Sequence, residues 1–383
     1  MKEMIKTSKP LIIFGAIFIF VIGYSLGNEN LPFNDSLKLT YQDIFQKNSE
    51  KNFENIEPIF YKTDVDSLIR IESEEDIISK RNNLINFIWK SDKIYSETDQ
   101  LVEKNFYDER YIDLDNLSQI DKYKIEMELG VNSIAYLFLP EKSNNELVIY
   151  HQGHSGDFFN GYETINHLLK NNYSVIAFSL PLLGPNNQPS VNVPNIGTFA
   201  LKNHDNFQFL DSETFSSIKY FVHPIFISLE QIEKNHDFNK YHMIGISGGA
   251  WVTTLYSALD ERIQKSYAVA GPLPRFLTVN VPGNQGDYEL NIPSLYDNAN
   301  LVELFIMSSY GNEREHVKIL NKYDPCCYYG NTFELFEKNI QDKMQKLDNG
   351  TFRIHLDTIN KKHTISNESM NLILSSLSTQ SND

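Results

Sequence analysis

One short motif constrains this chain more than any other feature, because it requires a particular turn. An apolar segment at residues 241–244 runs into the G-x-S-x-G motif at residues 245–249, and a helix-forming run follows from Val252. This pattern is typical of a sharp strand-to-helix turn that lifts a serine above the edge of a sheet. Glycines flank the serine because side chains there would collide with the neighbouring strand and helix. The motif therefore predicts an accessible nucleophile at Ser247.

Strands and helices alternate along the chain from about residue 124. Apolar segments with strand character lie at residues 124–129, 133–140, 146–151, 173–179, 242–245, 265–270, 316–323 and 352–356. Helical spacing of apolar residues marks 162–170, 218–232, 252–259, 300–307 and 332–346, with Pro224 expected to start or kink the second helix. Short apolar strands separated by helices indicate an α/β fold whose mostly parallel central sheet is flanked by helices on both faces.

Two residues in the C-terminal third complement Ser247. Asp324 ends a predicted strand, and His363 lies in the loop beyond the last one. Serine, then an aspartate at a strand end, then a histidine after the final strand is a chain order with a catalytic mechanism behind it.

Other residues compete for these positions. Glu313 and Glu315 are rivals of Asp324 if the strand is drawn differently, and His355 is the rival of His363. His355 is disfavoured because it falls inside a strand, away from the edge of the sheet. His204 is expected to be structural, and the segment 287–289 to be a solvated loop rather than part of a lid.

The motif and the chain order together resemble the α/β-hydrolase superfamily over roughly residues 124–378, about two thirds of the chain. The resemblance implies that Ser247 is the nucleophile, His363 the general base and then acid, and Asp324 the carboxylate that orients the histidine. A serine hydroxyl is a weak nucleophile until a base removes its proton, which is why the three side chains act as a unit.

The same resemblance implies an oxyanion hole made of two backbone N–H groups. Gly248 follows the nucleophile and supplies one donor, and the loop after the strand 146–151 supplies the other. That loop reads His-Gln-Gly-His at residues 151–154, where many esterases carry an H-G-G-G run. We expect the second donor within residues 152–154, with Gly153 and His154 as the candidates.

These residues predict a serine hydrolase that cleaves a small-molecule carboxylic ester through an acyl-enzyme. A serine peptidase, a thioesterase and an inactive binding protein with the same fold are the alternatives, and fold analogy does not choose among substrates. Residues 183–215, rich in Asn and Pro, are the expected cap loop. The chemistry requires no cofactor.

The N-terminus differs from the rest of the chain. Three lysines precede an uncharged apolar run at residues 10–26, which is about as long as the shortest membrane-spanning helix. We therefore expect residues 1–27 to be a signal-anchor, with a cleaved signal peptide as the alternative and the catalytic domain outside the cytoplasm. Residues 28–122 predict an accessory, mainly helical segment, and residues 123–379 the catalytic domain.

Composition excludes several other classes of protein. The formal net charge of −16 argues against binding to nucleic acid. Neither C-x-x-C nor H-E-x-x-H spacing occurs, so the sequence predicts no metal site. The two cysteines, Cys326 and Cys327, are adjacent, and we expect them to pack near the site without a bridge because disulfide geometry favours more widely separated Cα atoms.

Overall fold

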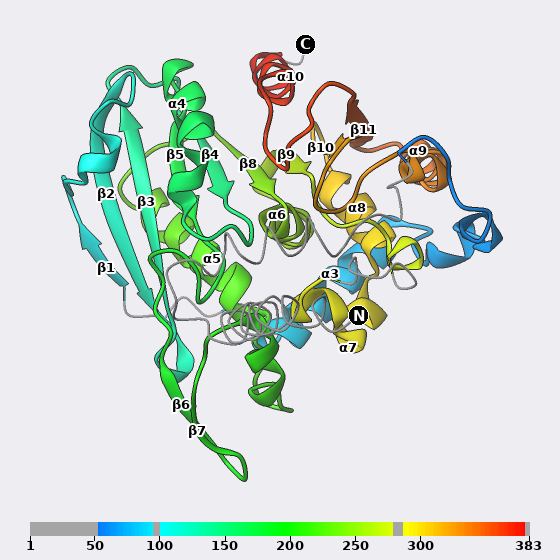
Figure 1. The fold of residues 1–383 in the computed structure, drawn as a ribbon, viewed down its shortest axis with the longest axis horizontal. Coiled ribbons are helices and arrows are strands. Elements are labelled where there is room, and N and C mark those ends of the chain that lie inside the picture. The colour runs from blue at the N-terminus through cyan, green and yellow to red at the C-terminus, as the bar shows by residue number, and fades with distance from the viewer. Residues whose placement is uncertain (1–52, 95–99, 279–285, 380–383) are drawn as a thin grey trace, which may run out of the picture. The chain divides into compact units, whose positions relative to one another are not determined.

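A nine-stranded sheet forms the centre of the structure, a computed structural model that describes residues 53–94, 100–278 and 286–379 (Figure 1). In spatial order, the strands are β1 (Gln100–Glu103), β2 (Leu117–Glu126), β3 (Asn132–Pro140), β5 (Ser174–Phe178), β4 (Glu146–His151), β8 (Lys240–Ile246), β9 (Ile263–Val269), β10 (Glu315–Asn321) and β11 (Thr351–Asp357). The six strands from β5 to β11 run parallel, and β1, β2 and β3 form an antiparallel extension. The sheet is therefore mostly parallel, as the alternating pattern predicts.

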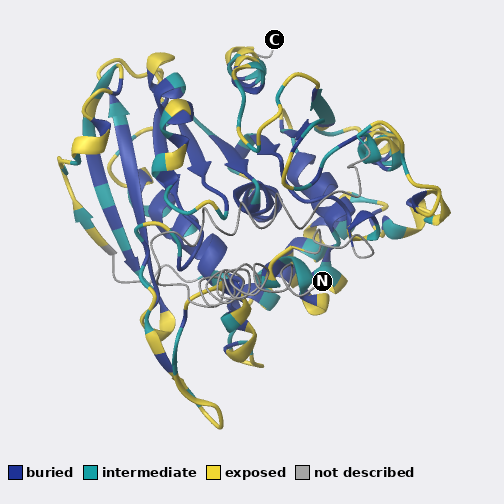
Figure 2. Ribbon diagram, in the orientation of Figure 1, coloured by how far each residue is buried: buried dark blue, intermediate teal, exposed yellow. Residues whose placement is uncertain are grey.

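Helices cover both faces of this sheet. The helices are α3 (Glu74–Trp89), α4 (Tyr162–Lys170), α5 (Lys219–Glu233), α6 (Gly248–Leu259), α7 (Pro293–Asn298), α8 (Leu301–Ser309), α9 (Glu337–Leu347) and α10 (Asn367–Ser378). Side chains of α4 and α10 join one buried apolar cluster, and those of α3, α5, α6, α8 and α9 join the other. Alternate residues of β4 divide between the two clusters, as a strand buried on both faces requires. Figure 2 shows the central strands as almost wholly buried.

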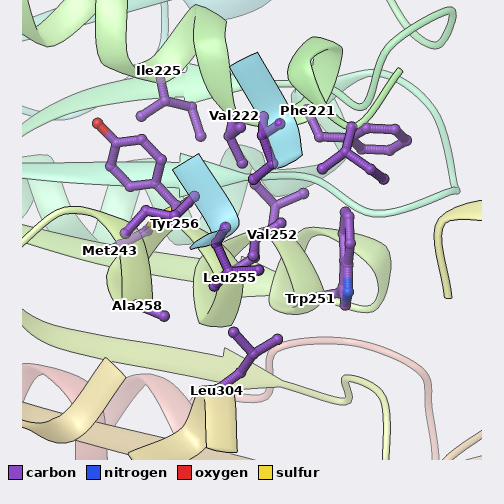
Figure 3. Packing of buried hydrophobic residues seen from close by; sticks show 14 of the residues in the cluster. Phe221, Val222, Ile225, Met243, Trp251, Val252, Leu255, Tyr256, Ala258 and Leu304 are labelled. Carbon is purple, nitrogen blue, oxygen red and sulfur yellow. The ribbon is translucent and has the colours of Figure 1, made fainter. Parts of the chain in front are cut away.

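Helix α6 lies at the heart of the larger cluster, and every one of its residues is buried. Phe221 and Val222 of α5 pack with Trp251 and Val252 of α6, and Leu304 of α8 belongs to the same cluster (Figure 3). A helix that is apolar on all sides belongs in the interior. Because α6 follows Ser247 directly, this packing fixes the position of that residue.

The sheet begins earlier than the sequence patterns indicate. We expected residues 28–122 to be mainly helical, but β1 and the first half of β2 lie in that range. The polar face of β2 hides its strand character, because its buried residues Ile120, Tyr123 and Ile125 are separated by charged and polar ones. Helix α3 is the one α-helix among the described residues of this segment.

The described segment at residues 53–94 is tied to helix α8 through a buried carboxylate. Glu303 of α8 is fully buried and lies 2.7 Å from Arg70 and 3.1 Å from Lys80. Arg81 of α3 donates a hydrogen bond to the carbonyl of Ala258 at the end of α6. Removing one partner from a buried ion pair is costly, so these contacts make the segment an integral part of this fold.

The expected membrane helix at residues 1–27 lies outside the described residues. Within the described ranges, no helix combines the length and the apolar character needed to cross a bilayer. The expected cap, residues 183–215, contains a hairpin of β6 (Ser190–Val193) and β7 (Gly197–Ala200) and the 3₁₀ helix η6 (His204–Phe209). Figure 1 shows the hairpin projecting from the sheet.

Candidate active site

Ser247 occupies a strained turn between β8 and α6. Its backbone angles are φ 57° and ψ −120°, a conformation that residues other than glycine rarely adopt. The carbonyl of Ser247 accepts the N–H of Ala250, so the helix starts immediately after the turn. Such strain costs of order 1–3 kcal/mol and persists only where the surroundings enforce it. The turn has the geometry that the G-x-S-x-G motif predicts.

The outer glycines of the motif are required by space. A Cβ at position 245 would lie 2.1 Å from the carbonyl oxygen of Gly249. A Cβ at position 249 would lie 2.1 Å from the carbonyl oxygen of His151 at the end of β4. Since these neighbours are backbone atoms of buried elements, they cannot move aside. The close approach of β4, β8 and α6 therefore depends on both glycines.

Asp324 and His363 are joined by a hydrogen bond. His363 Nδ1 lies 2.7 Å from Asp324 Oδ2, and the carboxylate is completely buried. The other oxygen of Asp324 accepts the backbone N–H groups of Cys326 at 2.8 Å and Cys327 at 3.3 Å. Three donors thus hold one carboxylate, which fixes its orientation toward the imidazole.

The second ring nitrogen of His363 is left open. Nε2 is buried and has no hydrogen-bond partner among the described residues, and no bond joins it to Ser247. Ser247 follows β8, Asp324 follows β10 and His363 follows β11, so all three residues lie beyond the carboxyl ends of parallel strands. Such ends meet at one edge of an α/β sheet, where ligands bind. Their catalytic roles remain a prediction.

The rival residues occupy other positions in the fold. Glu313 is exposed in the turn before β10, and Glu315 begins that strand and pairs with Arg353 at 2.6 Å. Both glutamates therefore lie toward the amino end of β10, opposite to Asp324. His355 lies within β11, and its Nε2 is 3.4 Å from Glu368.

The expectation that Cys326 and Cys327 remain unbridged is wrong. A disulfide joins the two adjacent residues, whose Cα atoms are 3.8 Å apart. Both residues lie in the turn that wraps around Asp324, and the carboxylate draws both N–H groups to one side. The local turn, which spacing alone does not reveal, brings the two sulfur atoms together.

The loop after β4 lies directly against the turn that carries Ser247. A Cβ at position 153 would lie 2.7 Å from Ser247 Cβ and 3.3 Å from the nitrogen of Gly248. The N–H of Gln152 donates to the carbonyl of Phe178 within the sheet, so it is not available to a substrate. This leaves Gly153 and His154, the two residues named from the sequence, as the candidate donors of this loop beside Gly248.

A histidine–carboxylate cluster that the sequence did not indicate adjoins this loop. His154 Nε2 lies 3.0 Å from Glu289 Oε1 and 3.1 Å from Asp287 Oδ2, and His204 Nδ1 lies 3.1 Å from Glu289 Oε2. Glu289 is buried, so the expectation of a solvated loop is wrong for this residue, and His204 belongs to a polar cluster rather than to the apolar core alone. No short motif links residues 154, 204 and 289, which is why sequence spacing gave no signal.

Burial and charge act in opposite directions in this cluster. Burial raises the pKa of Glu289, but the two histidines outweigh it and bring the pKa down to about 2. Burial lowers the pKa of His204, but Glu289 and the carbonyl of Pro181 outweigh it, so the net shift is upward. The cluster therefore favours positive charge beside a carboxylate.

An apolar cavity of about 130 Å³ opens beyond the carboxyl end of β9. Its lining includes Leu273 and Phe276 after β9, Leu301 and Val302 of α8, and Tyr328 from the loop that follows Asp324. Because β9 pairs with β8, this cavity lies beyond the strand next to the one that carries Ser247. Its lining is mostly apolar.

Solved structures with the same architecture identify the fold. Acetyl xylan esterase 1 from Thermoanaerobacterium sp. JW/SL YS485 superposes with a TM-score of 0.52 at 12% identity, over 85% of this chain and 100% of that chain. The fold is that of the α/β-hydrolases. An acetyl xylan esterase from Paenibacillus sp. R4 gives a TM-score of 0.54 at 14% identity, over 81% and 98% of the two chains. No protein-family model and no curated protein sequence matches this α/β-hydrolase-fold chain.

Proposed function

We propose that this chain is a serine hydrolase that cleaves carboxylic esters, with Ser247, His363 and Asp324 as its triad. The observation that carries the proposal is the Asp324–His363 hydrogen bond, which leaves the buried Nε2 of the histidine without a partner among the described residues. A buried imidazole nitrogen without a partner is costly, and accepting the proton of the Ser247 hydroxyl would satisfy it.

The reaction follows from these positions. Ser247 Oγ attacks the acyl carbon while His363 Nε2 takes its proton, and the Asp324 carboxylate stabilises the imidazolium through Nδ1. The N–H of Gly248 and one N–H from Gly153 or His154 would stabilise the oxyanion. The imidazolium then protonates the leaving alcohol, and a water molecule activated by the same histidine releases the acid and restores the serine.

The cavity beyond β9 favours an apolar acyl group, because its lining is mostly apolar and it lies beyond the strand next to the one that carries Ser247. Two solved structures that share this fold carry the name acetyl xylan esterase, which agrees with a small acyl group. We therefore propose acetyl and other short-chain esters as the substrate class.

A fluorophosphonate probe tests the proposal directly. The wild-type chain should be labelled, and both the Ser247→Ala and His363→Ala variants should lose labelling while their circular dichroism stays the same. Hydrolysis of nitrophenyl esters should then fall as the acyl chain lengthens from two carbons to eight. A folded wild-type protein that resists the probe would instead favour a binding protein, and preference for peptide or thioester substrates would favour the other two alternatives.

We also propose that residues 1–27 anchor the chain in a membrane, with the catalytic domain outside the cytoplasm. The uncharged run after the N-terminal lysines supports this proposal. Edman sequencing of the protein from its native membrane fraction tests it, since an intact N-terminus supports an anchor and a start after Gly27 supports a cleaved signal.

A further inference from the structure

Three potential metal-ligand atoms from three separate segments converge beside the nucleophile turn. They are Nε2 of His154 in the loop after β4, Nδ1 of His204 in η6, and Oε1 of Glu289 in the 3₁₀ helix η8 (Tyr288–Asn291). The two nitrogens are 3.3 Å apart, and Oε1 is 3.0 Å from His154 and 3.2 Å from His204. His204 and Glu289 are almost completely buried, and His154 is partly exposed.

The hydrogen bonding of His204 determines whether its Nδ1 carries a hydrogen or a lone pair. Nε2 lies 3.0 Å from the carbonyl oxygen of Pro181, which only accepts hydrogen bonds, so Nε2 carries a hydrogen. In the neutral ring, Nδ1 then directs a lone pair at both oxygens of Glu289. A lone pair facing a carboxylate in a buried site is repulsive, so a proton or a metal cation between them would stabilise the cluster.

The part of the chain that the structure describes supplies no other cation for Glu289. Among the described residues, its carboxylate contacts only the two histidines, and no lysine or arginine pairs with it. The ring of His204 stacks on Phe207 and meets Phe221 edge-on, so the charge stands in a poorly solvated environment. An unpaired carboxylate in such an environment is strongly disfavoured.

The spacing of the ligand atoms matches a tetrahedral zinc ion. With zinc–ligand bonds of about 2.0 Å, the edges of the tetrahedron are about 3.3 Å long. The three distances observed here lie between 3.0 and 3.3 Å. The bond from His204 Nε2 to a backbone carbonyl is the outer-shell contact that commonly orients a metal-binding histidine.

We propose that His154, His204 and Glu289 form a Zn²⁺ site. The fourth ligand would be either Asp287 Oδ2, which lies 3.1 Å from His154 Nε2, or a water molecule. Two imidazole nitrogens favour zinc over Ca²⁺ and Mg²⁺, which prefer oxygen ligands. The cluster of Cys326, Cys327 and His363 is not a comparable site, because its sulfur atoms are joined in a disulfide.

The site would hold the loop that lies over the nucleophile. A Cβ on Gly248 would lie 2.5 Å from the ring of His154, so this ring rests on the first residue of α6. The backbone of Gly153 touches Ser247 from the same loop. A cation bound to His154 would therefore link η6 and η8 to the candidate oxyanion hole.

Metal titration tests the site without relying on catalysis. The full-length Ser247→Ala protein is stripped with EDTA and titrated with Zn²⁺ by calorimetry, and metal content is measured after dialysis. We expect one equivalent of zinc per chain, a rise in Tm on zinc addition, and no response to Mg²⁺. The His154→Gln and Glu289→Gln variants should lose the bound zinc, whereas the matched Cys326→Ser/Cys327→Ser control should retain it.

If a variant fails to fold, the absorption spectrum of the Co²⁺-substituted wild-type chain distinguishes the histidine–carboxylate cluster from the cysteine cluster. Co²⁺ bound in the wild-type chain should give the intense visible absorption of a four-coordinate ion, without a thiolate charge-transfer band. A charge-transfer band that disappears in the cysteine variant would place the metal elsewhere and overturn the proposal. Absence of any bound zinc or cobalt would also overturn it, leaving a protonated His204 as the positive charge.

Discussion

The strained backbone of Ser247 leads to the prediction that one substitution abolishes activity and increases stability. Replacing Ser247 by glycine removes the side chain and relieves the conformation at φ 57° and ψ −120°. The relieved strain is of order 1–3 kcal/mol. The added freedom of glycine in the unfolded chain offsets about 0.5–1 kcal/mol of this gain. The Ser247→Gly variant should therefore be inactive and yet more stable by about 1 kcal/mol.

Urea unfolding measures this gain and separates it from the loss of the hydroxyl group. With m near 3 kcal/mol/M, a gain of 1 kcal/mol raises the unfolding midpoint by about 0.3 M. Ser247→Ala removes the hydroxyl but keeps Cβ, so its midpoint should stay close to that of the wild type. Ser257→Gly makes the same substitution inside α6, where the backbone is helical, and should lower stability by about 0.5–1 kcal/mol.

The comparison between the two variants at position 247 is decisive. If Ser247→Gly unfolds at the same urea concentration as Ser247→Ala, the turn stores no recoverable strain, and the argument that connects the backbone to a nucleophile turn fails. A change in m would indicate an altered unfolded state, and the midpoints would then not be compared directly.

Three further predictions follow from contacts at the site and in the core. Asp324→Asn should keep the fold and lower kcat for ester hydrolysis by about four orders of magnitude, because the amide no longer fixes the Nδ1–H tautomer of His363. Stopped-flow kinetics with a nitrophenyl ester measure this loss of kcat. A loss below tenfold would contradict the role of Asp324 in orienting the histidine. Gly153→Ala should lower kcat by at least about 10²-fold, since its Cβ would lie 2.7 Å from Ser247 Cβ, and kinetics beside circular dichroism would reveal any mere unfolding. Burial between aromatic rings lowers the pKa of His316 to about 3. The stability that the neutral imidazole contributes is therefore complete above about pH 6.5, and it falls by about 1.4 kcal/mol per pH unit as the pH decreases toward 3. His316→Phe should flatten the measured pH dependence of unfolding by that amount, and an unchanged slope would refute the low pKa.

The parts of the site that the sequence predicted are those with a local cause. Ser247 lies in a turn where backbone atoms within a few ångströms leave no room for a Cβ at Gly245 or Gly249. The G-x-S-x-G motif reflects this local constraint. Asp324 and His363 follow apolar strands, and the carboxyl ends of parallel strands meet at one edge, so strand prediction was enough to bring these residues together. Helix α4 also begins and ends where its apolar spacing indicates.

The parts that sequence reasoning missed depend on contacts between distant segments. Glu289 is buried against His154 and His204, which lie 135 and 85 residues away in the sequence. The residues next to Glu289 in the sequence give no indication of these partners. Strand β1 was missed because it is a short edge strand with polar residues, stabilised by pairing with β2. Helix α5 runs through Pro224, since burial among α6 and the sheet outweighs the lost hydrogen bond.

Two histidine–carboxylate pairs stand at the carboxyl edge of the sheet, and their hydrogen bonding distinguishes their roles. In the Asp324–His363 pair, Asp324 holds one nitrogen, and the other is buried with no partner among the described residues, so it is available to accept a proton. In the second cluster, the nitrogens of His204 are engaged by Pro181 on one side and by Glu289 on the other. A saturated imidazole has no capacity left for proton transfer during turnover. The same chemical groups thus serve acid–base chemistry in one place and the binding of a positive charge in the other.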